Sequence, residues 1–196
     1  LALELTGIGD TQPGSALLLN PAGMSVATQY EVTGSYVCSQ GGDNVMGLHA
    51  VEANAQSRFA LGLGYQTRLK GGEFCEHYGI LGASLSLGQI ATRPVYAGIA
   101  ARYVYEDATS DDVFDLDLGL LLPISSQISI GVVGRELLES FKLGAGAKFQ
   151  LERFNVNFDV LNERDSNLYE TRGALQILAN RTLTVRVGYR HLFADD

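Results

Sequence analysis

Hydrophobic and polar residues alternate along most of this chain. The pattern is clearest in FKLGAGAKFQLERFNVNFDVL, residues 141 to 161, where apolar side chains occupy every second position apart from one change of phase near residue 152. Successive side chains of a β-strand point to opposite faces of the sheet. The alternation therefore predicts strands with one apolar face and one polar face.

The same pattern predicts about eleven strands, separated by clusters of Gly, Asp, Asn and Ser. They cover residues 30 to 38, 45 to 53, 58 to 68, 74 to 88, 95 to 106, 113 to 122, 127 to 135, 141 to 151, 154 to 162, 168 to 178 and 182 to 193. No amphipathic helix is expected between them. The chain is therefore expected to be all-β, with a short non-strand segment at residues 1 to 29 and a sheet domain at residues 30 to 196.

Two antiparallel architectures fit half-apolar strands. A soluble sandwich or barrel turns its apolar face inward, whereas an outer-membrane barrel turns it toward lipid and its polar face toward the lumen. The polar face here is rich in Gly and small residues, which suits a crowded lumen better than a solvated surface. Aromatic residues gather near strand ends, as in the girdles of membrane barrels. Both features favour an up-and-down transmembrane β-barrel.

The turns also alternate in charge. The odd-numbered turns carry GGDN, LKGGE, EDATSDD, RELLES and NERDSN, while the even-numbered turns are short or nearly uncharged. Alternate turns of an up-and-down barrel lie at the same end, so an acidic rim is predicted there. Its principal residues are Asp107, Asp111, Asp112, Glu163 and Asp165. The rim could simply keep the loops solvated, bridge divalent cations to anionic lipopolysaccharide, or contact a basic partner.

The charge and composition of the chain argue against several other classes of protein. The 196-residue chain has a formal net charge of -8 and no basic stripe, which excludes nucleic acid as an expected partner. Its histidines are scattered, and it has neither a nucleophile elbow nor a phosphate-binding glycine loop. We therefore expect no enzymatic activity, no cofactor and no metal site.

Charged residues also occur on the predicted inward face of the strands. These lumen-facing charges are Arg58, Arg102, Asp115, Asp117, Lys142, Lys148, Asp159, Glu170, Arg172 and Arg186. Unpaired charges are costly in a confined, low-dielectric space, so mixed signs at this density indicate an ion-paired interior rather than a selective pore. A conduit for fatty acids should instead present apolar residues inward.

Residues 15 to 25 read SALLLNPAGMS, and the motif formed by Asn20, Pro21, Ala22 and Gly23 resembles the N-terminal signature of FadL/OmpP1-type outer-membrane barrels and their PorV-like relatives. The distal stretches FKLGAGAKFQLERFNVNFDV and TRGALQILANRTLTVRVGYR are similar to late barrel strands of the PorV-like branch. The resemblance implies a barrel of about fourteen strands in which residues 1 to 29 form a short hatch or plug. About three C-terminal strands are then expected beyond this sequence, unless the predicted strand count is wrong.

The resemblance implies two functions, both at the bacterial outer membrane of a Gram-negative cell. One is a PorV-like scaffold or anchor, surrounded by outer-membrane lipid and bound to other envelope proteins. The alternative is FadL-like passive transport of a small hydrophobic molecule. The predicted polar lumen favours the scaffold, and a soluble β-sandwich that acts as a binding module is a third hypothesis.

Overall fold

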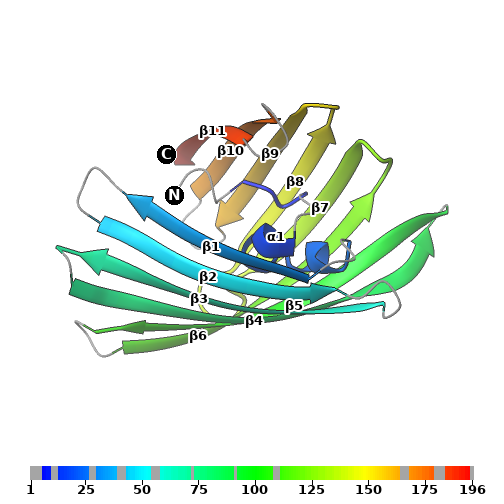
Figure 1. Ribbon diagram of the computed structural model, residues 1–196. Helices are drawn as coiled ribbons and strands as arrows, with labels where there is room; N and C mark the ends of the chain where they lie inside the picture. The colour runs from blue at the N-terminus through cyan, green and yellow to red at the C-terminus, as the bar shows by residue number, and fades with distance from the viewer. Residues whose placement is uncertain are drawn as a thin grey trace.

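A computed structural model of the chain forms one curved antiparallel sheet (Figure 1). The structure describes residues 6–9, 13–26, 30–38, 43–53, 58–71, 73–90, 92–107, 111–163, 168–178 and 184–194. The strands are β1 (Tyr30–Cys38), β2 (Asp43–Ala53), β3 (Phe59–Lys70), β4 (Glu73–Ile90), β5 (Arg93–Glu106), β6 (Asp111–Pro123), β7 (Ile128–Arg135), β8 (Lys142–Gln150), β9 (Phe154–Glu163), β10 (Leu168–Leu178) and β11 (Thr184–Ala194). All eleven predicted strands are confirmed, with every bound within two residues of its predicted position.

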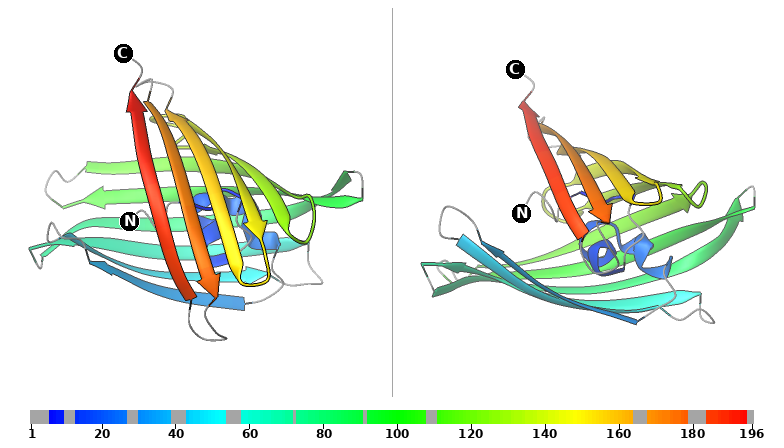
Figure 2. Two further views of the ribbon diagram at one scale, coloured as in Figure 1. Left: turned by 90° about the horizontal axis from the view of Figure 1, so that it is seen from above. Right: turned by 45° about the horizontal axis from the view of Figure 1, so that its top comes forward.

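The strands follow one another across the sheet in sequence order, each antiparallel to the next. Within the described residues, β1 pairs only with β2 and β11 pairs only with β10, so the sheet is not closed. It curves nonetheless into the wall of a barrel, as two further views show (Figure 2). The up-and-down order places all odd-numbered turns at one end, as the sequence predicts.

Two short helices lie inside the concave side of this wall (Figure 2). They are α1 (Pro13–Leu19) and the 3-10 helix η1 (Pro21–Ser25), and the alternation pattern does not predict them. Each is too short to produce a visible 3.6-residue period. Asn20 begins η1 because its side-chain oxygen accepts a hydrogen bond from the backbone N–H of Ala22 at 3.2 Å. In the described part of the chain, no helix is both long enough and apolar enough to cross a bilayer.

The two faces of the sheet differ as the alternation predicts. The convex face carries exposed large apolar side chains, among them Leu63, Leu81 and Val187 at 63%, 61% and 62% exposure. The concave face carries buried polar groups such as Asp117 and Asp159. A soluble β-sandwich would bury its apolar face between two sheets, so that architecture does not describe this fold.

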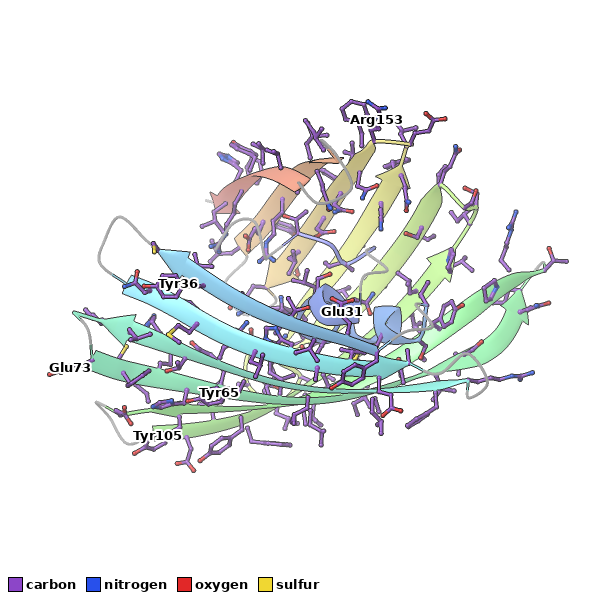
Figure 3. All side chains as sticks on the ribbon, viewed as in Figure 1. Glu31, Tyr36, Tyr65, Glu73, Tyr105 and Arg153 are labelled. Carbon is purple, nitrogen blue, oxygen red and sulfur yellow. The ribbon has the colours of Figure 1, made fainter. Side chains whose placement is uncertain are left out.

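Outward-facing aromatic residues occur toward both ends of the strands. At the end of the odd-numbered turns they are Tyr36, Phe74, Tyr103, Phe114, Tyr169 and Phe193, whereas Tyr65 and Tyr189 lie near the middle of β3 and β11. At the opposite end they are Tyr30, Phe59, Phe149 and Phe154. Figure 3 labels Tyr36 and Tyr105 toward the end of the strands where Glu73 lies. Two aromatic bands around an apolar belt are the arrangement of a transmembrane barrel.

Candidate functional site

The concave face holds the N-terminal segment, which we call the plug: residues 6–9 and 13–26. The plug lies on a row of glycines that pair directly across neighbouring strands. The pairs are Gly62 with Gly82, Gly98 with Gly119, and Gly131 with Gly146. A Cβ atom on Gly62 would lie 2.7 Å from Met24 Sδ, and one on Gly82 would lie 2.6 Å from Leu17 Cδ1. These glycines therefore allow the plug to approach the backbone of the wall.

The centre of the plug is Asn20, which is fully buried. Its Nδ2 donates to the carbonyl oxygen of Ile8 at 2.8 Å and to that of Leu120 on β6 at 3.1 Å. A Cβ atom on Gly119 would collide with Asn20 Oδ1, and one on Gly98 would collide with the backbone of Pro21. One side chain thus joins the two parts of the plug and attaches them to the wall.

Polar side chains of the wall hold other backbone groups of the plug. The carboxylate of Asp159 on β9 accepts from the N–H of Gly7 at 2.5 Å and from that of Ile8 at 3.1 Å. Ser129 Oγ donates to the Gly9 carbonyl at 2.6 Å. Arg102 Nη2 donates to the Leu18 carbonyl at 3.3 Å. Buried backbone groups need partners, and here the wall supplies them.

Apolar contacts complete the attachment. Ala16, Leu17 and Met24 form a buried cluster with inward-facing residues of β2 to β5, namely Val51, Ala53, Ala60, Ile80 and Ala100. Ile8 forms a second cluster with Val133 and Leu161. The predicted hatch motif, Asn20 to Gly23, is buried throughout. The sequence identifies this motif but not the paired glycines on which it lies, because glycine pairing depends on the register between strands.

A second region of the concave face lies beside the plug and is lined by charges. It is a cavity of about 350 Å³ where β7 to β11 approach the odd-numbered turns. Its charged lining residues are Arg135, Glu136, Lys142, Glu163, Glu170, Arg172 and Arg190. Leu161, Leu168 and Leu192 complete the lining. We refer to this region as the ionic cavity.

The charges around the ionic cavity share their partners. Glu170 accepts from Arg172 Nε at 2.7 Å and Arg172 Nη2 at 2.8 Å, and it also contacts Arg190. Asp117 contacts Arg102 and lies 3.9 Å from Arg135 Nε. These pairs give the interior the ion-paired character that the sequence predicts.

Lys142 Nζ shares two carboxylates at the mouth of the cavity. It lies 2.5 Å from Glu136 Oε2 and 3.6 Å from Glu163 Oε1. Ser140 Oγ also donates to Glu136, which lies in the turn after β7. Burial acts to raise the pKa of Glu136, but the hydrogen bonds from Lys142 and Ser140 outweigh it and hold that pKa below its ordinary value.

The remaining predicted lumen-facing charges lie at different places. Asp115 is buried and accepts from the backbone N–H groups of Leu116 and Leu138. Lys148 is buried near the opposite end of β8. Arg58 is exposed just before β3. Arg186 belongs to β11, but its side chain lies outside the described residues.

The predicted acidic rim is only partly described. Asp107 and Asp112 are exposed at the predicted end, on either side of the turn between β5 and β6. Glu163 lies at the same end but lines the ionic cavity. Asp165 and the side chain of Asp111 lie outside the described residues. No group of three or more His, Cys, Asp or Glu side chains that could hold a metal ion occurs in the described ranges.

Comparisons with known proteins identify a fold but no family. No family model matches the chain, and no curated protein matches it. Among solved structures, the fold is similar to that of a KdgM porin with a TM-score of 0.58, and to that of a KdgM porin in complex with disordered oligogalacturonate with a TM-score of 0.56. Each porin is 10% identical in sequence to this chain, and each match covers 83% of this chain and 89% of the porin chain. The chain therefore shares with these porins the antiparallel up-and-down sheet of a β-barrel wall, while the FadL and PorV resemblance stays a prediction.

Proposed function

We propose that this chain forms the wall of a bacterial outer-membrane β-barrel that is closed by its own plug and serves as a non-enzymatic scaffold or anchor in an envelope assembly. The observation that carries the proposal is the attachment of the plug. Hydrogen bonds run in both directions between plug and wall. Asn20 of the plug donates to backbone carbonyls of the plug and of β6, and three wall side chains bind backbone groups of the plug: Asp159, Ser129 and Arg102. A scaffold has no need to move such a plug, whereas a conduit through this region would have to break these buried hydrogen bonds.

Location in the outer membrane is supported by the apolar convex face, the aromatic bands and the porin-like fold. A substitution of Leu63→Arg tests it, because Leu63 faces outward near the middle of β3. In a membrane we expect a loss of about 2 to 4 kcal/mol in the free energy of unfolding, measured by urea titration in lipid vesicles. Glu52→Arg is the control, because Glu52 is exposed near the end of β2 and should cost at most about 1 kcal/mol. Equal effects of the two substitutions would contradict the membrane location.

The closed barrel also predicts how the protein behaves in planar bilayers. The purified native protein should give negligible conductance and should co-purify with other envelope proteins after mild detergent extraction. Its contacts would come from the exposed rim that includes Asp107 and Asp112, through a basic partner surface or a bridging divalent cation. A reproducible conductance that a solute blocks would overturn the scaffold proposal.

Transport of a small hydrophobic molecule is the alternative, and the apolar side of the plug favours it. Leu17 and Met24 cover inward-facing apolar residues of β2 to β5, so a displaced plug would uncover an apolar surface inside the barrel. Uptake of radiolabelled oleate by cells that express the protein tests this alternative. Transport predicts that Asn20→Ala changes uptake while the barrel stays folded. If the substitution impairs only folding, the motif has a structural role and no role in transport.

A further inference from the structure

The ionic cavity contains more cationic than anionic groups. Among the residues that the structure describes, its lining has four cationic side chains and three carboxylates: Arg135, Lys142, Arg172 and Arg190 with Glu136, Glu163 and Glu170. Arg102 and Asp117 lie behind this lining, and the buried residues Asp115 and Asp159 pair in the strand register with Arg102 and Arg172. Two carboxylates are each approached by two arginines. Glu170 contacts Arg172 and Arg190, whereas Asp117 contacts Arg102 and lies 3.9 Å from Arg135 Nε.

Arg135 is the least neutralised of these cations. Its side chain is only 11% exposed, and its nearest carboxylate oxygen, Asp117 Oδ2, lies 3.9 Å from Nε, beyond hydrogen-bond distance. Arg135 Nε is buried without a hydrogen-bond partner. Asp117 meanwhile accepts from Arg102 and from the backbone N–H of Glu136. A buried guanidinium with an unused donor is costly unless another anion approaches it.

We propose that the ionic cavity binds a small oxyanion, a carboxylate or a phosphate, with Arg135 as its principal contact. A guanidinium presents donors in a planar fork that matches the oxygens of either group. The cavity volume of about 350 Å³ leaves room for a small organic acid. The leucines of the lining can contact its carbon atoms. This site does not depend on the scaffold function, because a closed barrel and a conducting barrel could both hold an anion at this mouth.

Calorimetric titration of the full chain in detergent tests the proposal, with citrate and inorganic phosphate as separate probes and sucrose as the neutral comparison. We expect citrate, phosphate or both to bind, with an affinity that falls as salt is added, and sucrose not to bind. The substitution Arg135→Gln should weaken binding by roughly tenfold or more. Arg135→Lys keeps the charge and should restore part of the lost affinity. Which probe binds more tightly decides between carboxylate and phosphate chemistry.

Arg68→Gln is the matched control. Arg68 is an arginine near the same end of β3, but it pairs with Glu76 at 3.0 Å and is not part of the cavity lining. Heat-dependent mobility on gels verifies that each variant is folded, and Arg190→Gln on β11 replaces Arg135→Gln if the latter does not fold. Failure of both oxyanions to bind the folded protein would overturn the proposal. So would equal weakening by Arg68→Gln and Arg135→Gln, since that result would indicate only a general attraction of anions.

Discussion

The inner face of the sheet has two regions that differ in how they are filled. From β3 to β8 its centre is a row of glycines covered by the plug. From β7 to β11, toward the odd-numbered turns, it carries long charged side chains and encloses a cavity. The same alternation of residues builds both regions. The difference shows that glycines occupy the inward positions where the plug approaches the backbone of the wall most closely, whereas long charged side chains surround the ionic cavity.

The two regions should also respond differently to change. Close packing makes the plug region intolerant of added volume, because its glycines lie against buried plug side chains or, at Gly98 and Gly131, against plug backbone. The ionic cavity has space, and its charges can recruit water or ions when a partner is lost. Substitutions of similar size should therefore lower the free energy of unfolding more under the plug than around the cavity.

The largest effect is expected from Gly98→Val. A Cβ atom at this position would overlap the backbone of Pro21 and Ala22, so the plug could no longer pack against β5. We expect a loss of about 3 kcal/mol in the free energy of unfolding, measured by urea titration in vesicles, together with proteolytic cleavage of the plug.

Gly173→Val on β10 is the control for that substitution, because a Cβ atom there has open space around it. It should leave both stability and plug protection nearly unchanged. Equal losses of stability and equal proteolysis in the two valine variants would show that the plug does not depend on close contact with Gly98. The contrast between the two regions would then be wrong.

Asn20→Ala should have the next largest effect. It leaves the carbonyls of Ile8 and Leu120 without their donor and removes the cap of η1. Unsatisfied buried groups cost about 1 to 3 kcal/mol, and the same urea titration would measure the loss. Gln150→Ala, at an exposed position at the end of β8, is the neutral comparison. An unchanged midpoint for Asn20→Ala would mean that the plug is held by its apolar contacts alone.

Much of this fold could be predicted from the sequence because its main signal is local. Alternation reports which face each residue occupies, so the strands and the apolar convex face follow directly from positions such as Leu61 and Leu63. The order of the turns then gives the up-and-down topology. Both inferences need only neighbouring residues.

The candidate site could be predicted only in part, because it depends on register between strands. The sequence places Asp159 on the inner face, but it does not reveal that this carboxylate accepts from Gly7 and Ile8, more than 150 positions away. Glu163 was assigned to the rim from its turn, yet it lies 3.6 Å from Lys142 in the cavity. Direct pairing of Gly98 with Gly119 likewise follows from the register of β5 and β6, which alternation alone does not fix.

A smaller effect is expected at the centre of the ionic cavity. Glu170→Gln leaves Arg172 and Arg190 without their shared carboxylate. We expect a loss of roughly 1 to 2 kcal/mol in the free energy of unfolding, at the lower end for charged hydrogen bonds because solvent can enter the cavity. The same substitution should strengthen citrate binding, since it removes a negative charge from the lining of the cavity. Weaker citrate binding in a folded Glu170→Gln protein would contradict this account of the cavity.

The smallest effect concerns pH and the turn after β7. The pKa of Glu136 lies below its ordinary value, so its ionised form stabilises the folded turn. This contribution is fully present above the ordinary carboxylate range and is lost as the pH falls through the lowered pKa, below about pH 4. Hydrogen exchange of the Leu137 and Leu138 amides should therefore be slower in the native protein than in Glu136→Gln at pH 7, and the difference should shrink as the pH falls through the lowered pKa. Because Asp115 and Asp117 also accept from this turn, the comparison between the two proteins is needed to isolate Glu136. A difference that stays constant over the whole acidic titration would show that Glu136 acts through its shape rather than its charge.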